Sequence, residues 1–166
     1  MQIDEVYFAY GSNLHCRQMQ NRCPTSWPLK KAVLKNHELC FPIKSGSWRC
    51  AGVAGVRHHL EMQVHGMLYV LSKEDLDTLD RYEGHPCVYK RREMLVHDEN
   101  GQQIIAWTYL PRSIEKNETF KPSSKYLDRI IKGALEHHLP AYYLEFLRTI
   151  STVNSDPSSL PTKEIS

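Results

Sequence analysis

Hydrophobic and polar positions alternate over much of the first two thirds of the chain. Short runs of aliphatic and aromatic residues, bounded by turn-forming residues, predict strands at residues 6–10, 32–41, 48–56, 64–71, 88–96 and 103–110. Asn100 and Gly101 lie between the last two runs, and an Asn-Gly pair favours the positive φ angles of a tight hairpin turn. The pattern therefore predicts a largely antiparallel sheet.

Helical spacing and capping residues predict four helices, at residues 14–23, between Ser72 and Gly84, at residues 124–138 and at residues 141–150. The second is the most strongly specified. Ser72 followed by Asp75 resembles a capping box, and Gly84 tolerates the left-handed conformation of a helix C-terminus. Pro24 ends the first helix, and Pro140 opens the last.

Strands in succession followed by two late helices are typical of an α+β domain with short flanking helices. Six strands of this length can close into a small barrel or remain an open curved sheet, and the pattern leaves both alternatives open. The chain has 166 residues, which is the size of one domain, and we expect that domain at residues 1–150. Residues 151–166 are rich in Ser, Pro and Thr and lose all periodicity, so a flexible C-terminal tail is expected there.

Charge and composition restrict the partners. The chain has 21 Lys and Arg against 19 Asp and Glu, and 41% of its residues are hydrophobic, which is enough for a core. A net charge of +2 provides no strong field for a nucleic acid backbone or an anionic membrane. The sequence contains neither a membrane-spanning apolar run nor a basic, apolar leader. We therefore expect a cytoplasmic protein that binds neither nucleic acid nor membrane.

Cysteine and histidine do not indicate a metal centre. The cysteines are odd in number and contain no C-x-x-C pair, so free thiols are expected at Cys16, Cys23, Cys40, Cys50 and Cys87. Several histidines are adjacent in the sequence, and adjacent residues of a strand or helix do not face one site. No metal is expected.

The first candidate for chemistry is the segment Tyr10-Gly11-Ser12-Asn13, where a predicted strand meets a predicted helix. A glycine turn at this position exposes backbone N–H groups that suit a carboxylate or a developing oxyanion. The alternative is a purely structural turn, in which Gly11 provides the bend and Ser12 or Asn13 caps the helix.

Glu83 is the second candidate. Leu76 and Leu79 mark the buried face of the second helix, and Glu83 follows Leu79 by four residues and points to the same side. A carboxylate in apolar surroundings has a raised pKa, which suits a general acid or base near neutral pH. The alternative is a Glu at a fraying helix end that turns to water. Asp75 is expected to be solvated, and Asp80, on the flank of the buried face, is the other candidate acid.

Residues 6–14, 65–71 and 79–84 resemble three sequence motifs of the γ-glutamylcyclotransferases. The order of the three motifs and the distances between them along the chain are also similar. The similarity continues to the late helices and covers roughly residues 5–150. The resemblance implies a compact α+β fold around a small mixed, barrel-like sheet. It also implies a substrate loop at Tyr10, Gly11, Ser12 and Asn13, reached through Tyr7, Phe8 and Ala9, with a pocket tyrosine at Tyr89 and a catalytic acid at Glu83.

The activity that the resemblance implies needs no cofactor. The α-amine of a γ-glutamyl substrate attacks its own γ-carbonyl, which closes 5-oxoproline and expels an amino acid or amine. One Glu can accept the first proton and deliver the second, while loop N–H groups stabilise the oxyanion. At Ser12-Asn13 the sequence resembles the branch of the family that acts on γ-glutamyl amino acids more than the branch that acts on γ-glutamylamines, and the resemblance therefore implies the former substrates.

Two rival functions remain at this point. The first is a related cyclotransferase that acts on a γ-glutamylamine or a biosynthetic γ-glutamyl intermediate. The second is a binding module that has kept the pocket and lost catalysis. In each case the expected partner is a small molecule, and both a monomer and a homodimer are compatible with the sequence.

Overall fold

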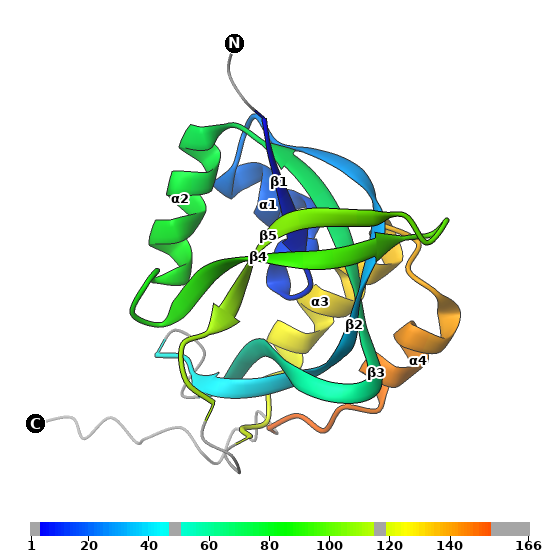
Figure 1. Ribbon diagram of the computed structural model, residues 1–166. Coiled ribbons are helices and arrows are strands. Elements are labelled where there is room, and N and C mark those ends of the chain that lie inside the picture. The colour runs from blue at the N-terminus through cyan, green and yellow to red at the C-terminus, as the bar shows by residue number, and fades with distance from the viewer. Residues whose placement is uncertain (1–3, 47–50, 115–118, 154–166) are drawn as a thin grey trace, which may run out of the picture.

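The computed structural model describes residues 4–46, 51–114 and 119–153 of the chain. In chain order these residues form β1 (Glu5–Ala9), the 3-10 helix η1 (Ser12–Leu14), α1 (Cys16–Arg22), β2 (Trp27–Lys44), β3 (Gly52–Leu71), α2 (Lys73–Glu83), β4 (Tyr89–Asp98), β5 (Gln103–Pro111), α3 (Ser124–Glu136) and α4 (Ala141–Arg148). The strands wrap around a common core, with α2 on one side of the barrel and α4 on the other (Figure 1).

The sheet is a closed barrel in the order β1-β3-β2-β4-β5. Each neighbouring pair along this order is antiparallel. The barrel closes where β1 lies parallel to β5, with Tyr7 opposite Trp107. The α+β class and the mixed, largely antiparallel sheet are thus confirmed, and the structure selects the barrel over the open sheet.

The described residues form five strands where the sequence predicts six. The strands expected at residues 48–56 and 64–71 belong to one long strand, β3, and residues 48–50 lie outside the described residues. Side chains 58–63 are exposed, which interrupts the hydrophobic alternation, and the pairing of β3 with β2 shifts register between Gln63, opposite Lys35, and His58, opposite His37. The prediction was wrong because it read a solvated stretch of strand as a break.

The capping of α2 agrees with the sequence. Ser72 Oγ accepts a hydrogen bond from the Asp75 backbone N–H over 3.1 Å, and Gly84 is left-handed with φ of 64°. The Asp75 side chain, however, is buried and accepts hydrogen bonds from Thr25 Oγ1 and the Thr25 N–H. Asp75 is therefore not solvated as expected, because it ties α2 to the segment that precedes β2.

The hairpin and the remaining helices also follow the pattern. Gly101 has φ of 78° in the turn between β4 and β5, as the Asn-Gly pair predicts. Two of the helices, α3 and α4, occupy the predicted segments. By contrast, α1 begins at Cys16, because the His15 side chain caps it by accepting from the Gln18 N–H.

The core of the protein lies inside the barrel and beneath α2 and α3. Phe8, Leu68 and Leu79 are fully buried there. No helix in residues 4–46, 51–114 and 119–153 is both long and apolar enough to cross a membrane. Most of the expected C-terminal tail, residues 154–166, lies outside the described residues.

Candidate active site

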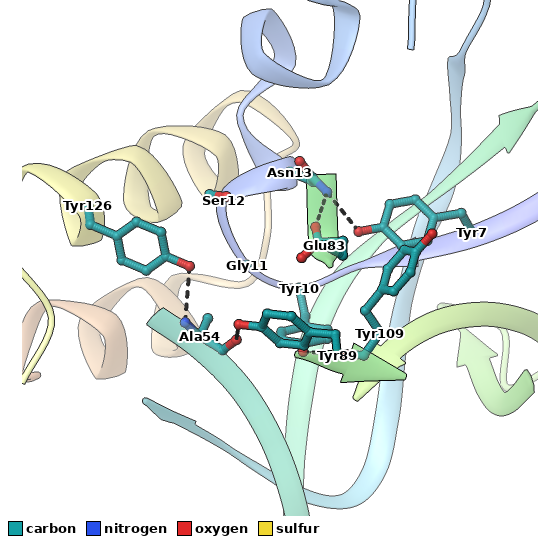
Figure 2. A pocket seen from close by; sticks show the side chains of 10 residues that line it. All are labelled: Tyr7, Tyr10, Gly11, Ser12, Asn13, Ala54, Glu83, Tyr89, Tyr109 and Tyr126. Atoms are coloured by element: carbon teal, nitrogen blue, oxygen red, sulfur yellow. Dashed lines mark hydrogen bonds between the residues drawn. The ribbon is translucent and has the colours of Figure 1, made fainter. Parts of the chain in front are cut away.

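A pocket of about 300 Å³ lies at the end of β1, where the chain leaves the barrel. Figure 2 shows the side chains around it, which are contributed by Tyr7, Tyr10, Gly11, Ser12, Asn13, Ala54, Glu83, Tyr89, Tyr109 and Tyr126. Seven of the nine residues expected at the site line this pocket. The other two, Phe8 and Ala9, are fully buried in the core. They are the last two residues of β1, which leads into the loop.

The loop after β1 presents backbone donors to the pocket. Its N–H groups at Gly11 and Ser12 make no hydrogen bond with any described residue, whereas the carbonyls of both accept from the following turn. A Cβ atom on Gly11 would lie 3.2 Å from Cβ of Ala54, so the loop passes close to β3. Neither Ser12 nor Asn13 caps α1, a role that His15 fulfils; both line the pocket, and Ser12 Oγ accepts from Gln18 Nε2 over 2.7 Å.

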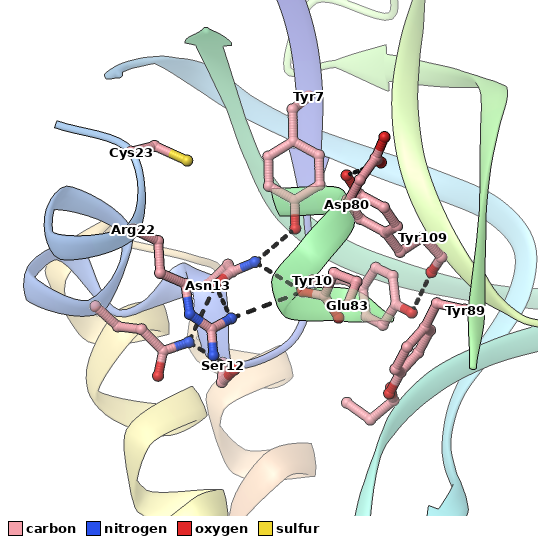
Figure 3. Close-up of polar contacts among 12 residues, drawn as sticks. Tyr7, Tyr10, Ser12, Asn13, Arg22, Cys23, Asp80, Glu83, Tyr89 and Tyr109 are labelled. Atoms are coloured by element: carbon pink, nitrogen blue, oxygen red, sulfur yellow. Dashed lines mark hydrogen bonds and ion pairs between the residues drawn. The ribbon is translucent and has the colours of Figure 1, made fainter. Parts of the chain in front are cut away.

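Glu83 is the last residue of α2 and faces the pocket from the opposite side. Its Oε1 accepts a hydrogen bond from Asn13 Nδ2 over 3.1 Å and lies 3.7 Å from Arg22 NH1 (Figure 3). Its Oε2 makes no hydrogen bond with the described residues, and only 17% of the side chain is exposed. Burial raises the pKa of Glu83, while Arg22 and Asn13 oppose that rise. The side chain does not turn out to water.

Asn13 is held in one orientation by its neighbours. It is almost fully buried, and its Nδ2 also donates to the Tyr7 hydroxyl over 3.0 Å. Its Oδ1 accepts from Arg22 NH1 at 2.9 Å and from Gln18 Nε2 at 3.0 Å. The Asn13 amide therefore directs its Nδ2 donor toward Glu83 and its Oδ1 acceptor toward α1.

The other candidate acid, Asp80, has different partners. Its two carboxylate oxygens accept from the Tyr109 hydroxyl at 2.7 Å and from Arg91 NH1 at 2.8 Å. With both oxygens engaged in this way, Asp80 supports the wall of the pocket instead of lining it. Arg91 is half-buried in this ion pair.

Buried tyrosines make up much of the wall. Burial raises the pKa of Tyr7, Tyr10 and Tyr89 and raises that of Tyr126 to about 12, so these hydroxyls remain neutral hydrogen-bond donors at physiological pH. Tyr126 accepts from the Ala54 N–H over 3.0 Å, and Tyr89 donates to the Ala54 carbonyl.

Sequence reasoning missed Tyr126, Tyr109, Ala54 and Arg22. Tyr126 occupies an apolar position of an amphipathic helix, and Arg22 is a basic residue in the last turn of one. An apolar helix position usually belongs to the core, and a basic residue in a last turn usually stabilises the helix C-terminus. No local signal therefore marks Tyr126 or Arg22 as a pocket residue. Among the described residues, His, Cys, Asp and Glu form no group of three that could hold a metal ion.

Comparisons with known proteins agree with this geometry. The model of the AIG2-like family matches residues 63–147. The γ-glutamylcyclotransferases of Homo sapiens and Mus musculus are each 31% identical over 150 residues, covering 87% of this chain and 78% of the relative. A solved structure titled γ-glutamyl cyclotransferase, 28% identical, superposes with a TM-score of 0.84 over 99% of this chain and 94% of its own. The chain belongs to the γ-glutamylcyclotransferase family of enzymes.

Proposed function

We propose that this protein converts γ-glutamyl amino acids into 5-oxoproline and the free amino acid, with Glu83 as general acid and base. The observation that carries the proposal is the position of Glu83. This carboxylate is largely buried, its pKa is raised by that burial, and it lies across one pocket from the free N–H groups of Gly11 and Ser12. A general base that faces hydrogen-bond donors for an oxyanion suits an acyl transfer in which the nucleophile is an amine.

In the proposed reaction, Glu83 accepts a proton from the α-ammonium group of the substrate. The freed nitrogen attacks the γ-carbonyl carbon and forms the C–N bond of the five-membered lactam. The carbonyl oxygen becomes an oxyanion, for which the Gly11 and Ser12 N–H groups are available donors. Glu83 then gives its proton to the leaving nitrogen as the old amide bond breaks, and it carries the second proton of the ring nitrogen to the departing amine, which leaves as an ammonium. Glu83 is again a carboxylate, and the lactam nitrogen keeps one hydrogen.

The nucleophile and the carbonyl belong to the same molecule, so the main task of the pocket is to hold the folded conformer. Effective molarities in well-oriented intramolecular reactions are large, on the order of 10⁵ M or more. The Tyr7 hydroxyl, which accepts from Asn13 Nδ2 and is kept neutral by burial, can donate to the α-carboxylate of the glutamyl group. The narrow space of the pocket favours a compact substrate.

The cytoplasm is the proposed setting. Cys16, Cys23, Cys40 and Cys87 are free cysteines, and burial raises the pKa of Cys16, Cys23 and Cys40 to about 11 to 12. Unpaired, unreactive thiols are typical of proteins in a reducing compartment. The proposed partner is a small γ-glutamyl molecule.

The test is release of 5-oxoproline from γ-glutamyl-alanine by the wild type and by Glu83→Gln. Gln keeps the shape and can still accept from Asn13 through its amide oxygen, but it cannot take the proton. We expect kcat to fall by about 10²- to 10⁴-fold, the usual contribution of a general acid or base.

The matched control is Glu93→Gln, which removes an exposed carboxylate from β4 and should retain wild-type turnover. Thermal stabilisation of Glu83→Gln by γ-glutamyl-alanine would show that binding survives. Wild-type turnover in Glu83→Gln would exclude the proposed role. Ligand binding without any product from the wild type would favour the binding module.

A further inference from the structure

A second, wider pocket of about 880 Å³ adjoins the first. The two pockets share Ser12, Glu83, Tyr89 and Tyr126. A substrate whose glutamyl group occupies the inner pocket, with its amide nitrogen near Glu83, has to extend into this outer pocket. The outer pocket is therefore in the right place for the part of the substrate that leaves.

The outer pocket has an uneven distribution of charge. Its described lining includes three cations, Arg22, Lys44 and Arg81, and a single carboxylate, that of Glu83. Apolar side chains from the ends of β2 and β3, Ile43 and Val53, complete one wall. This combination suits a ligand that is anionic at one end and aliphatic at the other.

The three cations differ in how far they are already engaged. Arg22 donates to Asn13, pairs with Glu83 and stacks over the Tyr82 ring at 4.6 Å, so it belongs to the catalytic network. Lys44 and Arg81 are exposed, and no carboxylate of the described residues lies within 4.0 Å of either charge.

Lys44 and Arg81 are nevertheless positioned by neutral groups. Lys44 Nζ lies 4.9 Å from the centre of the Phe120 ring, and Arg81 NH2 donates to Thr78 Oγ1 over 2.8 Å. These contacts orient the two side chains without neutralising them. Both positive charges therefore remain available to an anion in the outer pocket.

We infer that the outer pocket is the leaving-group subsite and that Lys44 and Arg81 select leaving groups with a free carboxylate. The inference rests on the proposed cyclotransferase function and adds the residues that determine its specificity. Amino acids and short peptides carry this carboxylate, whereas amines and amides do not. The aliphatic wall at Ile43 and Val53 would contact the side chain of the departing amino acid.

The experiment compares γ-glutamyl-alanine with γ-glutamyl-alaninamide, which differ in the leaving group only by replacement of the carboxylate with a neutral amide. The wild type should show a higher kcat/KM for the acid. Exposed ion pairs contribute up to about 1 kcal/mol each, so two cations predict a preference of roughly 5- to 25-fold. In Lys44→Gln/Arg81→Gln, the ratio of the two kcat/KM values should fall to about 1, mainly through a higher KM for the acid.

The matched control is Lys73→Gln/Arg92→Gln, which removes the same charge from exposed positions on α2 and β4 that do not line either pocket. It should keep the wild-type ratio. A wild-type ratio near 1, an unchanged ratio in Lys44→Gln/Arg81→Gln, or an equal loss in the control would each overturn the inference while leaving the proposed function intact. If the wild type released 5-oxoproline from neither compound, the proposed function itself would fail, and the inference with it.

Discussion

Asn13 and Glu83 lie 70 residues apart in the chain, and Asn13 Nδ2 donates a hydrogen bond to Glu83 Oε1 over 3.1 Å (Figure 3). Because Asn13 is fixed by Tyr7, Gln18 and Arg22, this bond fixes the orientation of the carboxylate. With Oε1 occupied, Oε2 is the oxygen left for the substrate. The loop after β1 therefore orients the Glu83 carboxylate, in addition to its proposed role in binding the glutamyl group.

Replacing Arg22 should change the pH dependence of turnover. The Arg22 cation lowers the pKa of Glu83, so Arg22→Gln should raise that pKa and move the acidic limb of kcat/KM to higher pH. The plateau should also fall by about tenfold, because a hydrogen bond to a charged group contributes about 1.5 kcal/mol. Measurement of kcat/KM against pH tests both effects. Arg17→Gln, an exposed change on the same helix, is the control, and an acidic limb unchanged in Arg22→Gln would contradict the prediction.

Glu83→Gln should make the protein more stable at neutral pH. Burial raises the pKa of Glu83, so ionisation of this group destabilises the folded state. That cost is absent well below the ordinary pKa of 4.5 and fully present above the folded-state pKa. The gain of the variant in free energy of unfolding should therefore grow as pH rises through this interval. Urea unfolding at a series of pH values measures it, and a gain that did not vary with pH would refute the explanation.

Asp75 should contribute to stability without affecting catalysis. Asp75→Ala removes the acceptor of two hydrogen bonds from Thr25, each of which contributes about 0.5–1.5 kcal/mol, so the free energy of unfolding should fall by about 1–3 kcal/mol. Asp77→Ala, on the exposed side of α2, should change the free energy of unfolding by less than about 0.5 kcal/mol. Urea unfolding compares the two variants. Equal stabilities would show that the contacts of Asp75 carry no net energy.

Gly133 should be required for the position of the loop. A Cβ atom at this position of α3 would lie 2.3 Å from the Leu14 carbonyl carbon and 2.5 Å from the His15 nitrogen. Ala in a helix interior normally stabilises by about 1 kcal/mol relative to Gly, but Gly133→Ala should destabilise the protein and lower kcat/KM because η1 has to move.

The Gly133 prediction is checked by thermal unfolding and by 5-oxoproline release at a temperature where the variant is folded. Asp128→Ala, an exposed change on the same helix, is the control and should have little effect on either measurement. A Gly133→Ala variant as stable and as active as the wild type would mean that α3 and η1 adapt without moving the pocket.

Much of the candidate site could be predicted because its residues carry local signals. The glycine turn after β1 and the capped helix ending at Gly84 are marked by residues within a few positions of each other. The spacing of Glu83 from Leu79 places the acid on the buried side of α2, where the structure has it. The family resemblance implies that these two segments belong to one site.

Other features had no local signal. Arg22 and Tyr126 reach the pocket from two helices whose patterns are those of ordinary amphipathic segments. Asp75 occupies a capping-box position in the sequence but bonds to Thr25, 50 residues away. The parallel pairing of β1 with β5, which closes the barrel, also joins segments 100 residues apart.

The sequence by itself therefore determined the order of strands and helices, except that it divided β3 into two strands, and it determined the caps of α2 and the side of that helix on which Glu83 lies. These features depend on periodicity and on contacts within one or two turns, which the chain encodes locally. Only the tertiary structure decided that the barrel closes, that Asn13 meets Glu83, and that Lys44 and Arg81 line a shared outer pocket. Those relations depend on how distant segments pack around one core, because the same local patterns are compatible with more than one arrangement of the sheet.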